Sequence, residues 1–192
     1  MSDEQGSPVG SGAAAGSNVR QLDFHPGMDM RWEITRSSAD TDGELFEATN
    51  WLDAGMAGPP VHVHPTAEES YTIVEGALDV CVDGEWRTVQ AGETATVPAG
   101  VPHTLRTTSG EPIRLVNIHR PAQQFESFFR EMHALIHQGK LKRLPPNGPR
   151  SAIYAGMLFA KYPGEIRATK PPNGVFKALA AVGRALRFKL EP

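Results

Sequence analysis

Apolar and polar residues alternate in short runs between residues 24 and 119, which is the pattern of β-strands with one buried face. The clearest runs are 78–82 and 86–89, and the Asp83-Gly84 pair between them predicts a tight hairpin. Other turn signals follow at Glu75-Gly76, Ala91-Gly92, Ala99-Gly100 and Ser109-Gly110. Strands at this spacing, without helices between them, predict an all-β sandwich or barrel.

The pattern takes on a helical period after Pro121. Apolar residues follow the i, i+3, i+4, i+7 spacing across residues 125–136, and Gly139 is placed to end that helix. A second short helix is predicted over residues 153–160. A third helix would carry one apolar face, made of Val175, Leu179, Val182, Leu186 and Leu190. We expect this face to pack against the β domain or a second subunit, in preference to a membrane surface.

Composition divides the chain into three segments. Residues 1–18 are Gly, Ser, Ala and acidic residues with little to bury, and they predict a disordered tail. Residues 19–120 form the predicted β-barrel, and residues 121–192 form a C-terminal helical extension. The first 129 residues carry 7 basic and 19 acidic groups, whereas the remainder carries 12 basic and 3 acidic groups. The acidic front part argues against nucleic-acid binding there.

Cysteine content and hydropathy narrow the class of protein further. A single cysteine, Cys81, excludes a disulfide framework or a cysteine-based zinc site within the chain. The first 18 residues lack the basic and apolar parts of a secretory signal, and no apolar run approaches the roughly 20 residues of a membrane span. We therefore expect a cytoplasmic protein that acts on a small molecule and not on nucleic acid or a membrane.

Three histidines and one glutamate carry the predicted chemistry. His62 and His64 stand two apart on one predicted strand, so both side chains point to the same face. Glu69 returns on the next strand, and His103 comes from a distant one. Imidazoles with one carboxylate suit Fe, Mn, Ni, Co, Cu or Zn and not Ca or Mg. The four residues predict a site for one divalent transition metal, with coordination positions left open for substrate.

The choice between two adjacent carboxylates depends on strand parity. Glu69 shares a strand face with Tyr71 and Ile73, and it alone keeps six residues before the turn glycine Gly76. We therefore assign Glu69 to the metal site and expect Glu68 on the surface.

Other histidines and aromatic residues have simpler interpretations. His119 and Asn117 share the parity of Leu115 and could face the cavity, although a strand-end histidine is the commoner case. His133 and His137 lie four apart on the first helix, where a solvated face is expected. Three aromatic residues are expected in the core, with the pocket wall as the alternative location. They are Tyr71, Phe46 and Trp51.

The two histidine segments resemble the paired motifs of the cupin superfamily. The first motif, G-x5-HxH-x3,4-E-x6-G, is matched by His62, His64, Glu69 and Gly76. The second motif, G-x5-PxG-x2-H-x3-N, is matched by Gly92, Pro98, Gly100 and His103. Two positions depart, since Met56 stands at the leading glycine and Thr107 at the final asparagine. Neither is a ligand position, so the metal interpretation is unaffected.

The resemblance implies an all-β fold across roughly residues 25–120, the cupin double-stranded β-helix or jelly-roll barrel, followed by the C-terminal helical extension. Because cupin barrels commonly pair, it also implies a homodimer. The ligand set of His62, His64, Glu69 and His103 is similar to that of quercetin-dioxygenase-like members. In such a protein Glu69 would be both a ligand and the catalytic proton acceptor for an enol or catechol hydroxyl.

The favoured function is therefore a dioxygenase-like oxidoreductase acting on a small aromatic or enolic substrate. One alternative is a metal-dependent sugar isomerase or epimerase, which would want Lys or Arg in the cavity to hold a phosphate. The predicted barrel has no lysine, and Arg106 and Arg114 are expected to point outward. The other alternative is a non-catalytic small-molecule-binding or regulatory protein.

Overall fold

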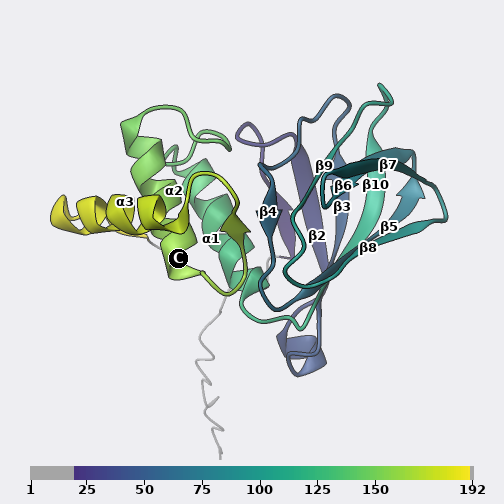
Figure 1. The fold of residues 1–192 in the computed structure, drawn as a ribbon, viewed down its shortest axis with the longest axis horizontal. Coiled ribbons are helices and arrows are strands. Elements are labelled where there is room, and N and C mark those ends of the chain that lie inside the picture. The colour runs from purple at the N-terminus through teal and green to yellow at the C-terminus, as the bar shows by residue number, and fades with distance from the viewer. Residues whose placement is uncertain (1–19, 191–192) are drawn as a thin grey trace, which may run out of the picture.

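The structure, a computed structural model, describes residues 20–190 as two antiparallel β-sheets and three helices (Figure 1). The six-stranded sheet contains, in spatial order, β1 (Gln21–Asp23), β2 (Met30–Arg36), β3 (Phe46–Leu52), β10 (Ile113–Arg120), β5 (Glu68–Glu75) and β8 (Thr94–Val97). The five-stranded sheet contains β11 (Arg167–Ala168), β4 (His62–Val63), β9 (His103–Arg106), β6 (Ala77–Val82) and β7 (Glu85–Gln90). The helices are α1 (Phe125–His137), α2 (Pro149–Lys161) and α3 (Asn173–Ala185), and a 3-10 turn spans Ala39–Thr41.

The predicted all-β region with C-terminal helices is confirmed, and the strands form a sandwich of two antiparallel sheets and not a closed barrel. Among the described strands, no edge strand of one sheet pairs with an edge strand of the other. Every second side chain of β3 and β10 is buried, as the alternating pattern predicts for sheets with one covered face. Inward side chains of both sheets, including Phe46, Leu78 and Leu115, share one hydrophobic cluster.

Two local predictions are confirmed. Strands β6 and β7 form the expected hairpin, and Asp83 and Gly84 have φ values of 51° and 86°, as a type I′ turn requires. Helix α1 ends at the expected glycine, because Gly139 (φ 65°) lets its own amide and that of Lys140 donate back to the carbonyls of Ile136 and Leu135. Helix α2 begins earlier than residue 153, at Pro149, where a proline suits the first helical turn.

Helix α3 leaves three of the five residues of the predicted apolar face exposed. The side chains of Val175, Val182 and Leu186 are 42%, 45% and 59% exposed. The helix instead packs on α2 through small residues at a close crossing. A Cβ added at Gly156 of α2 would lie 2.4 Å from Leu179 Cβ, and one added at Gly183 would lie 2.4 Å from Met157 Sδ. Close backbone approach at these glycines determines which face is covered.

The C-terminal segment also completes the five-stranded sheet. Strand β11 pairs with β4, so that Ala168 lies opposite His62 and Arg167 opposite Val63. In Figure 1 the helices lie together on one side of the sheets, with α1 nearest to the strands and α3 farthest from them. The C-terminal segment is therefore not purely helical, because it contributes a strand to the β region. The predicted disordered tail, residues 1–18, lies outside the described residues.

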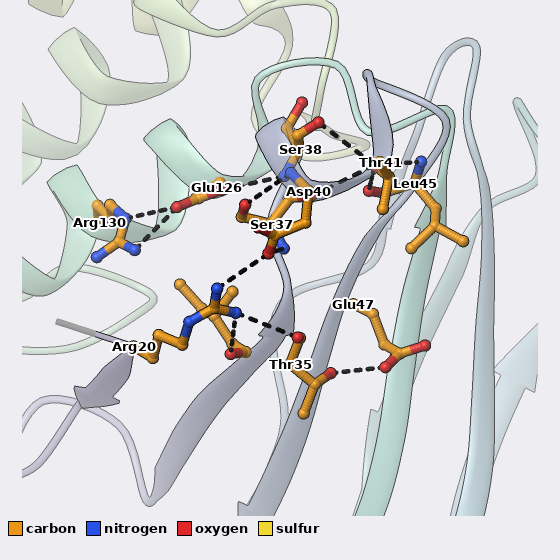
Figure 2. Close-up of polar contacts among 11 residues, drawn as sticks. Arg20, Thr35, Ser37, Ser38, Asp40, Thr41, Leu45, Glu47, Glu126 and Arg130 are labelled. Atoms are coloured by element: carbon orange, nitrogen blue, oxygen red, sulfur yellow. Dashed lines mark hydrogen bonds and ion pairs between the residues drawn. The ribbon is translucent and has the colours of Figure 1, made fainter. Parts of the chain in front are cut away.

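A polar network joins the β2–β3 connection to the start of α1. Figure 2 shows the Glu126 carboxylate accepting a hydrogen bond from the Ser38 amide at 3.2 Å while pairing with Arg130 at 2.8 Å. Arg20, at the edge of the six-stranded sheet, pairs with Asp40 at 3.1 Å. These contacts fix where α1 begins relative to the six-stranded sheet. No helix in residues 20–190 is long and apolar enough to cross a membrane.

Candidate metal centre

The structure brings the four predicted ligands together between the two sheets. His62 and His64 come from β4 and the residue after it, Glu69 from β5 and His103 from β9. His62 and His103 are direct cross-strand partners, whereas Glu69 belongs to the opposite sheet. One nitrogen or oxygen atom from each of the four lies within 4.8 Å of those of the others, and all four side chains are buried. This arrangement can enclose a single metal ion.

Each imidazole is held by its Nδ1 atom. His62 Nδ1 lies 2.9 Å from the Pro60 carbonyl and His103 Nδ1 lies 2.9 Å from the Val101 carbonyl. His64 Nδ1 lies 2.6 Å from the carbonyl of Glu165, which comes 101 positions later in the chain. A carbonyl oxygen only accepts, so each ring donates from Nδ1. Nε2 is therefore the ring nitrogen that faces the centre, as in proteins whose metal-bound histidines are oriented by an outer hydrogen bond.

Glu69 directs one carboxylate oxygen toward the imidazoles, and its other oxygen accepts a hydrogen bond. Its Oε2 lies 2.9 Å from His64 Nε2 and 2.8 Å from His103 Nε2. Its Oε1 accepts a hydrogen bond from Asn117 Nδ2 at 2.8 Å. Glu68 is exposed on the outer face, as strand parity predicts. The carboxylate therefore faces the imidazoles through Oε2.

The electrostatics of the cluster keep His62 neutral and Glu69 ionised. Burial, with the neighbouring His103 and His64, lowers the pKa of His62 to about 3, so this ring is neutral. Burial alone would raise the pKa of Glu69, but the attraction of His119 and His64 and the hydrogen bond from His103 hold it well below its usual value. Burial opposes the protonation of His103, yet its hydrogen bond to Glu69 raises its pKa. Three imidazoles with one ionised carboxylate fit a first-row transition metal.

The two positions that depart from the motif contact each other. Thr107 Oγ1 accepts a hydrogen bond from the Met56 amide at 2.7 Å and donates to the Asp53 carbonyl at 2.7 Å. The Thr107 amide donates to the Met56 carbonyl at 3.0 Å. This pairing ties the loop that leads into β4 to the end of β9, so the departures do not loosen the ligand strands.

A comparison with known families agrees with this geometry. Residues 52–119 match the family model described as the cupin domain. This segment of the chain therefore resembles a cupin domain. A 69-residue segment is 38% identical to quercetin 2,3-dioxygenase of Bacillus subtilis (strain 168), covering 35% of this chain and 20% of that protein. A 54-residue segment is 37% identical to the HTH-type transcriptional regulator SutR of Escherichia coli (strain K12), covering 28% of this chain and 30% of that protein.

These curated relatives are therefore matched over less than a third of their own length. Among solved structures, an RmlC-like cupin from Shewanella frigidimarina NCIMB 400 is 24% identical, with 61% of this chain and 96% of that chain covered and a TM-score of 0.46.

The β-sheets share a cavity with the C-terminal segment. A cavity of about 270 Å³ begins at the histidine cluster and runs between the sheets and the helices. Its walls are mainly apolar, with Met30, Trp32 and Leu52 from the sheet and Phe128, Phe159 and Leu179 from the helices. Phe125 of α1 stacks on His119 with ring centroids 4.0 Å apart and meets His64 edge-on at 5.0 Å. Such walls exclude water from the site.

Two polar residues of β10, Asn117 and His119, face the cavity, and His119 is also the second-last residue of the strand. His119 lies opposite Glu69 and Asn117 opposite Tyr71, and β10 lies between β3 and β5 inside the sheet. His119 is 1% and Asn117 is 2% exposed, and both line the cavity. Burial lowers the pKa of His119 against the opposing charge of Glu69. The parity with Leu115 was the available sequence signal.

The remaining candidates fall outside the centre, except for Tyr71. Burial and the nearby Glu69 raise the pKa of Tyr71 well above its usual value, so it keeps its proton in the cavity wall. Phe46 is in the core but not in the lining, and Trp51 stacks under Arg31. His137 is exposed on α1, whereas His133 is partly buried against Phe24.

The lysine and arginine side chains around the cavity agree with the expectation that Arg106 and Arg114 point outward. Arg106 lies over Trp86 and pairs with Asp79, and Arg114 pairs with Glu75, so both point outward as expected. Among the described residues that line the cavity, Lys170 is the only lysine or arginine. It is exposed and comes from the C-terminal segment. The sequence-based expectation covered only the lysines and arginines of the β region, so Lys170 was not predicted to line the cavity.

Proposed function

We propose that the chain binds one divalent transition metal through His62, His64, Glu69 and His103 and acts as a dioxygenase-like oxidoreductase on a small aromatic or enolic molecule. The observation that carries the proposal is the buried cluster itself. Three imidazoles, each fixed through Nδ1, and one carboxylate oxygen converge beside an apolar cavity. Fe, Mn, Ni, Co, Cu and Zn all accept this donor set. When bound, such an ion would supply open coordination positions and, for a redox metal, electron transfer with oxygen.

The chain's own residues supply positioning and proton transfer. Glu69 is ionised and buried beside the imidazoles, so it is placed to accept a proton from a hydroxyl group that enters the centre. The apolar walls contributed by Trp32 and Phe128 suit a planar apolar body and keep water out. The resemblance to quercetin 2,3-dioxygenase supports this reaction class in particular.

Two other functions have less support. A sugar-phosphate isomerase would need cations inside the cavity, but among the described lining residues the only such group is the exposed Lys170. A non-catalytic ligand-binding role is suggested by the resemblance to a transcriptional regulator.

The homodimer also stays a prediction, which sedimentation equilibrium would test.

Oxygen consumption tests the proposed reaction. Chain loaded with Fe, Mn, Ni, Co or Cu should consume oxygen when catechols or flavonols are added, whereas His103→Ala treated with the same metals should not. Metal-loaded wild-type chain that binds these molecules without oxygen uptake would support the ligand-binding alternative. Oxygen uptake equal in wild type and His103→Ala would remove the proposed centre from the reaction.

A further inference from the structure

Two buried side chains beside Glu69 have polar atoms without partners. His119 is 1% exposed, and neither of its ring nitrogens has a hydrogen bond within residues 20–190. Asn117 is 2% exposed, and its Oδ1 is likewise unpaired. More than nine in ten buried polar groups in proteins are paired, and an unpaired one destabilises the fold. Three such atoms lie on neighbouring inward positions of one strand, and all three are available to pair with a bound ligand.

Local contacts fix these groups in place. Asn117 Nδ2 donates to Glu69 Oε1 at 2.8 Å and to the Ser70 carbonyl at 3.3 Å, so the amide cannot turn to satisfy Oδ1. The His119 ring is stacked against Phe125 with centroids 4.0 Å apart. Its Nε2 lies 3.2 Å from Glu69 Oε1 without the alignment that a hydrogen bond requires. The two residues therefore present an acceptor and an imidazole at a set distance from the metal centre.

The charge of the inner cavity limits the ligand. Among the described lining residues Glu69 is the only carboxylate, and Lys170, the only lysine or arginine, is exposed. A divalent ion with one carboxylate and neutral imidazoles leaves a net charge of +1. That charge is balanced by a ligand with one negative charge, and a buried dianion such as a phosphate monoester would be left uncompensated.

We propose that Asn117 and His119 form a subsite that binds the hydroxyl-bearing end of a monoanionic catechol or enol. One ligand oxygen would face the metal, and a hydroxyl retained by the ligand would donate to Asn117 Oδ1. The His119 imidazole, with one donor and one acceptor when neutral, pairs with the same end of the ligand. This inference rests on the proposed function and names the ligand class and the side chains that select it.

The test uses His119→Phe, which keeps an aromatic ring against Phe125 and removes both nitrogens. Wild type and variant are loaded with the same metal, and the binding of 4-nitrocatechol is measured by its absorbance change. We expect the variant to keep its metal and its melting temperature, because it loses no hydrogen bond, and to bind the catechol at least about tenfold more weakly. The matched control is His133→Phe, the same replacement at a partly buried histidine outside the cavity, which should bind as wild type does.

A conservative variant separates hydrogen bonding from shape. His119→Gln restores a donor and an acceptor and should bind 4-nitrocatechol more tightly than His119→Phe does. Inorganic phosphate should not compete with the catechol. Equal affinity in wild type, His119→Phe and His119→Gln would overturn the subsite, as would loss of metal in both variants, which would make His119 part of the metal centre. Failure of the wild-type chain to bind metal would instead refute the proposed function, and the subsite with it.

Discussion

The strands before Pro121 and the helices after it contribute to the same cavity in different ways. The strands supply the four candidate ligands, which converge because β4, β5 and β9 place them on inward positions of two facing sheets. The helical segment supplies no candidate ligand. It supplies the Glu165 carbonyl that holds His64, the Phe125 ring that covers His119 and His64, and part of the apolar wall. The strand region thus supplies the candidate ligands, and the C-terminal segment orients and encloses them.

The largest expected effect comes from the strand side. His103→Ala should reduce metal affinity by roughly 100-fold or more, because it removes a ligand. Loss of an outer hydrogen-bond partner of a ligand typically reduces metal affinity by only about 10- to 100-fold. Both sheets should remain folded by circular dichroism. His133→Ala, the same change on α1 outside the cavity, is the control and should bind metal like wild type. Full metal occupancy in His103→Ala would show that the ligand set is wrong.

A large effect is also expected where the helical side touches the centre. Phe125 is fully buried, so Phe125→Ala should lower the free energy of unfolding by about 3–5 kcal/mol. Because Phe125 packs on His64 and His119, the variant should also bind metal more weakly. Urea denaturation and metal titration measure the two quantities. Val175→Ala on the exposed side of α3 is the control, with a change below about 0.5 kcal/mol. A Phe125→Ala chain as stable as wild type would mean that α1 does not cover the site.

The close crossing of α2 and α3 gives a smaller effect. Gly156→Val should destabilise the chain by about 1–3 kcal/mol, because the new side chain meets Leu179 Cβ within van der Waals distance. Gly174→Ala in the first turn of α3 is the matched control. Nothing lies within 4 Å of a Cβ there, so the change should be neutral or slightly stabilising. Thermal unfolding of both variants measures the difference, and equal melting temperatures would contradict the crossing.

The smallest expected effect is electrostatic and involves His25, which follows β1. His25 is held between Asp23 at 2.6 Å and Asp53 at 3.0 Å, and its hydrogen bonds to Asp53 and Asp23 raise its pKa. A hydrogen bond from the His25 amide lowers the pKa of Asp23. A raised histidine pKa stabilises the fold fully below its unfolded value of 6.5, and the stabilisation is lost as the pH rises through the folded pKa.

Because Asp23 is ionised above its lowered pKa, the contribution is greatest between about pH 4 and pH 6.5. His25→Gln should therefore cost less than about 1 kcal/mol at pH 5.5, since the pair is exposed, and nothing at pH 9. Urea denaturation at the two pH values checks this. A larger loss at pH 9 than at pH 5.5 would reverse the expected sign.

Features determined by neighbouring residues were predictable from the sequence. The β6–β7 hairpin depends on Asp83-Gly84, and the inward direction of His62, His64 and Glu69 depends on strand parity. Features that depend on distant contacts were not. The Glu165 carbonyl reaches His64 across 101 positions, and no local pattern marks a backbone acceptor. The covered face of α3 depends on glycines, which a pattern of apolar residues does not include. Closure of the two sheets into a barrel depends on pairing between their edge strands.

The most direct test of the central claim is the metal content of the untagged chain. The protein is prepared without chelators, incubated with Fe, Mn, Co, Ni, Cu or Zn, desalted, and measured by elemental analysis against His62→Ala treated in the same way. We predict about one ion per wild-type chain and almost none in the variant, since the four donors form one site. A wild-type chain that retains none of these ions, or a His62→Ala chain that retains as much as wild type, would contradict the assignment of a metal centre to this cavity.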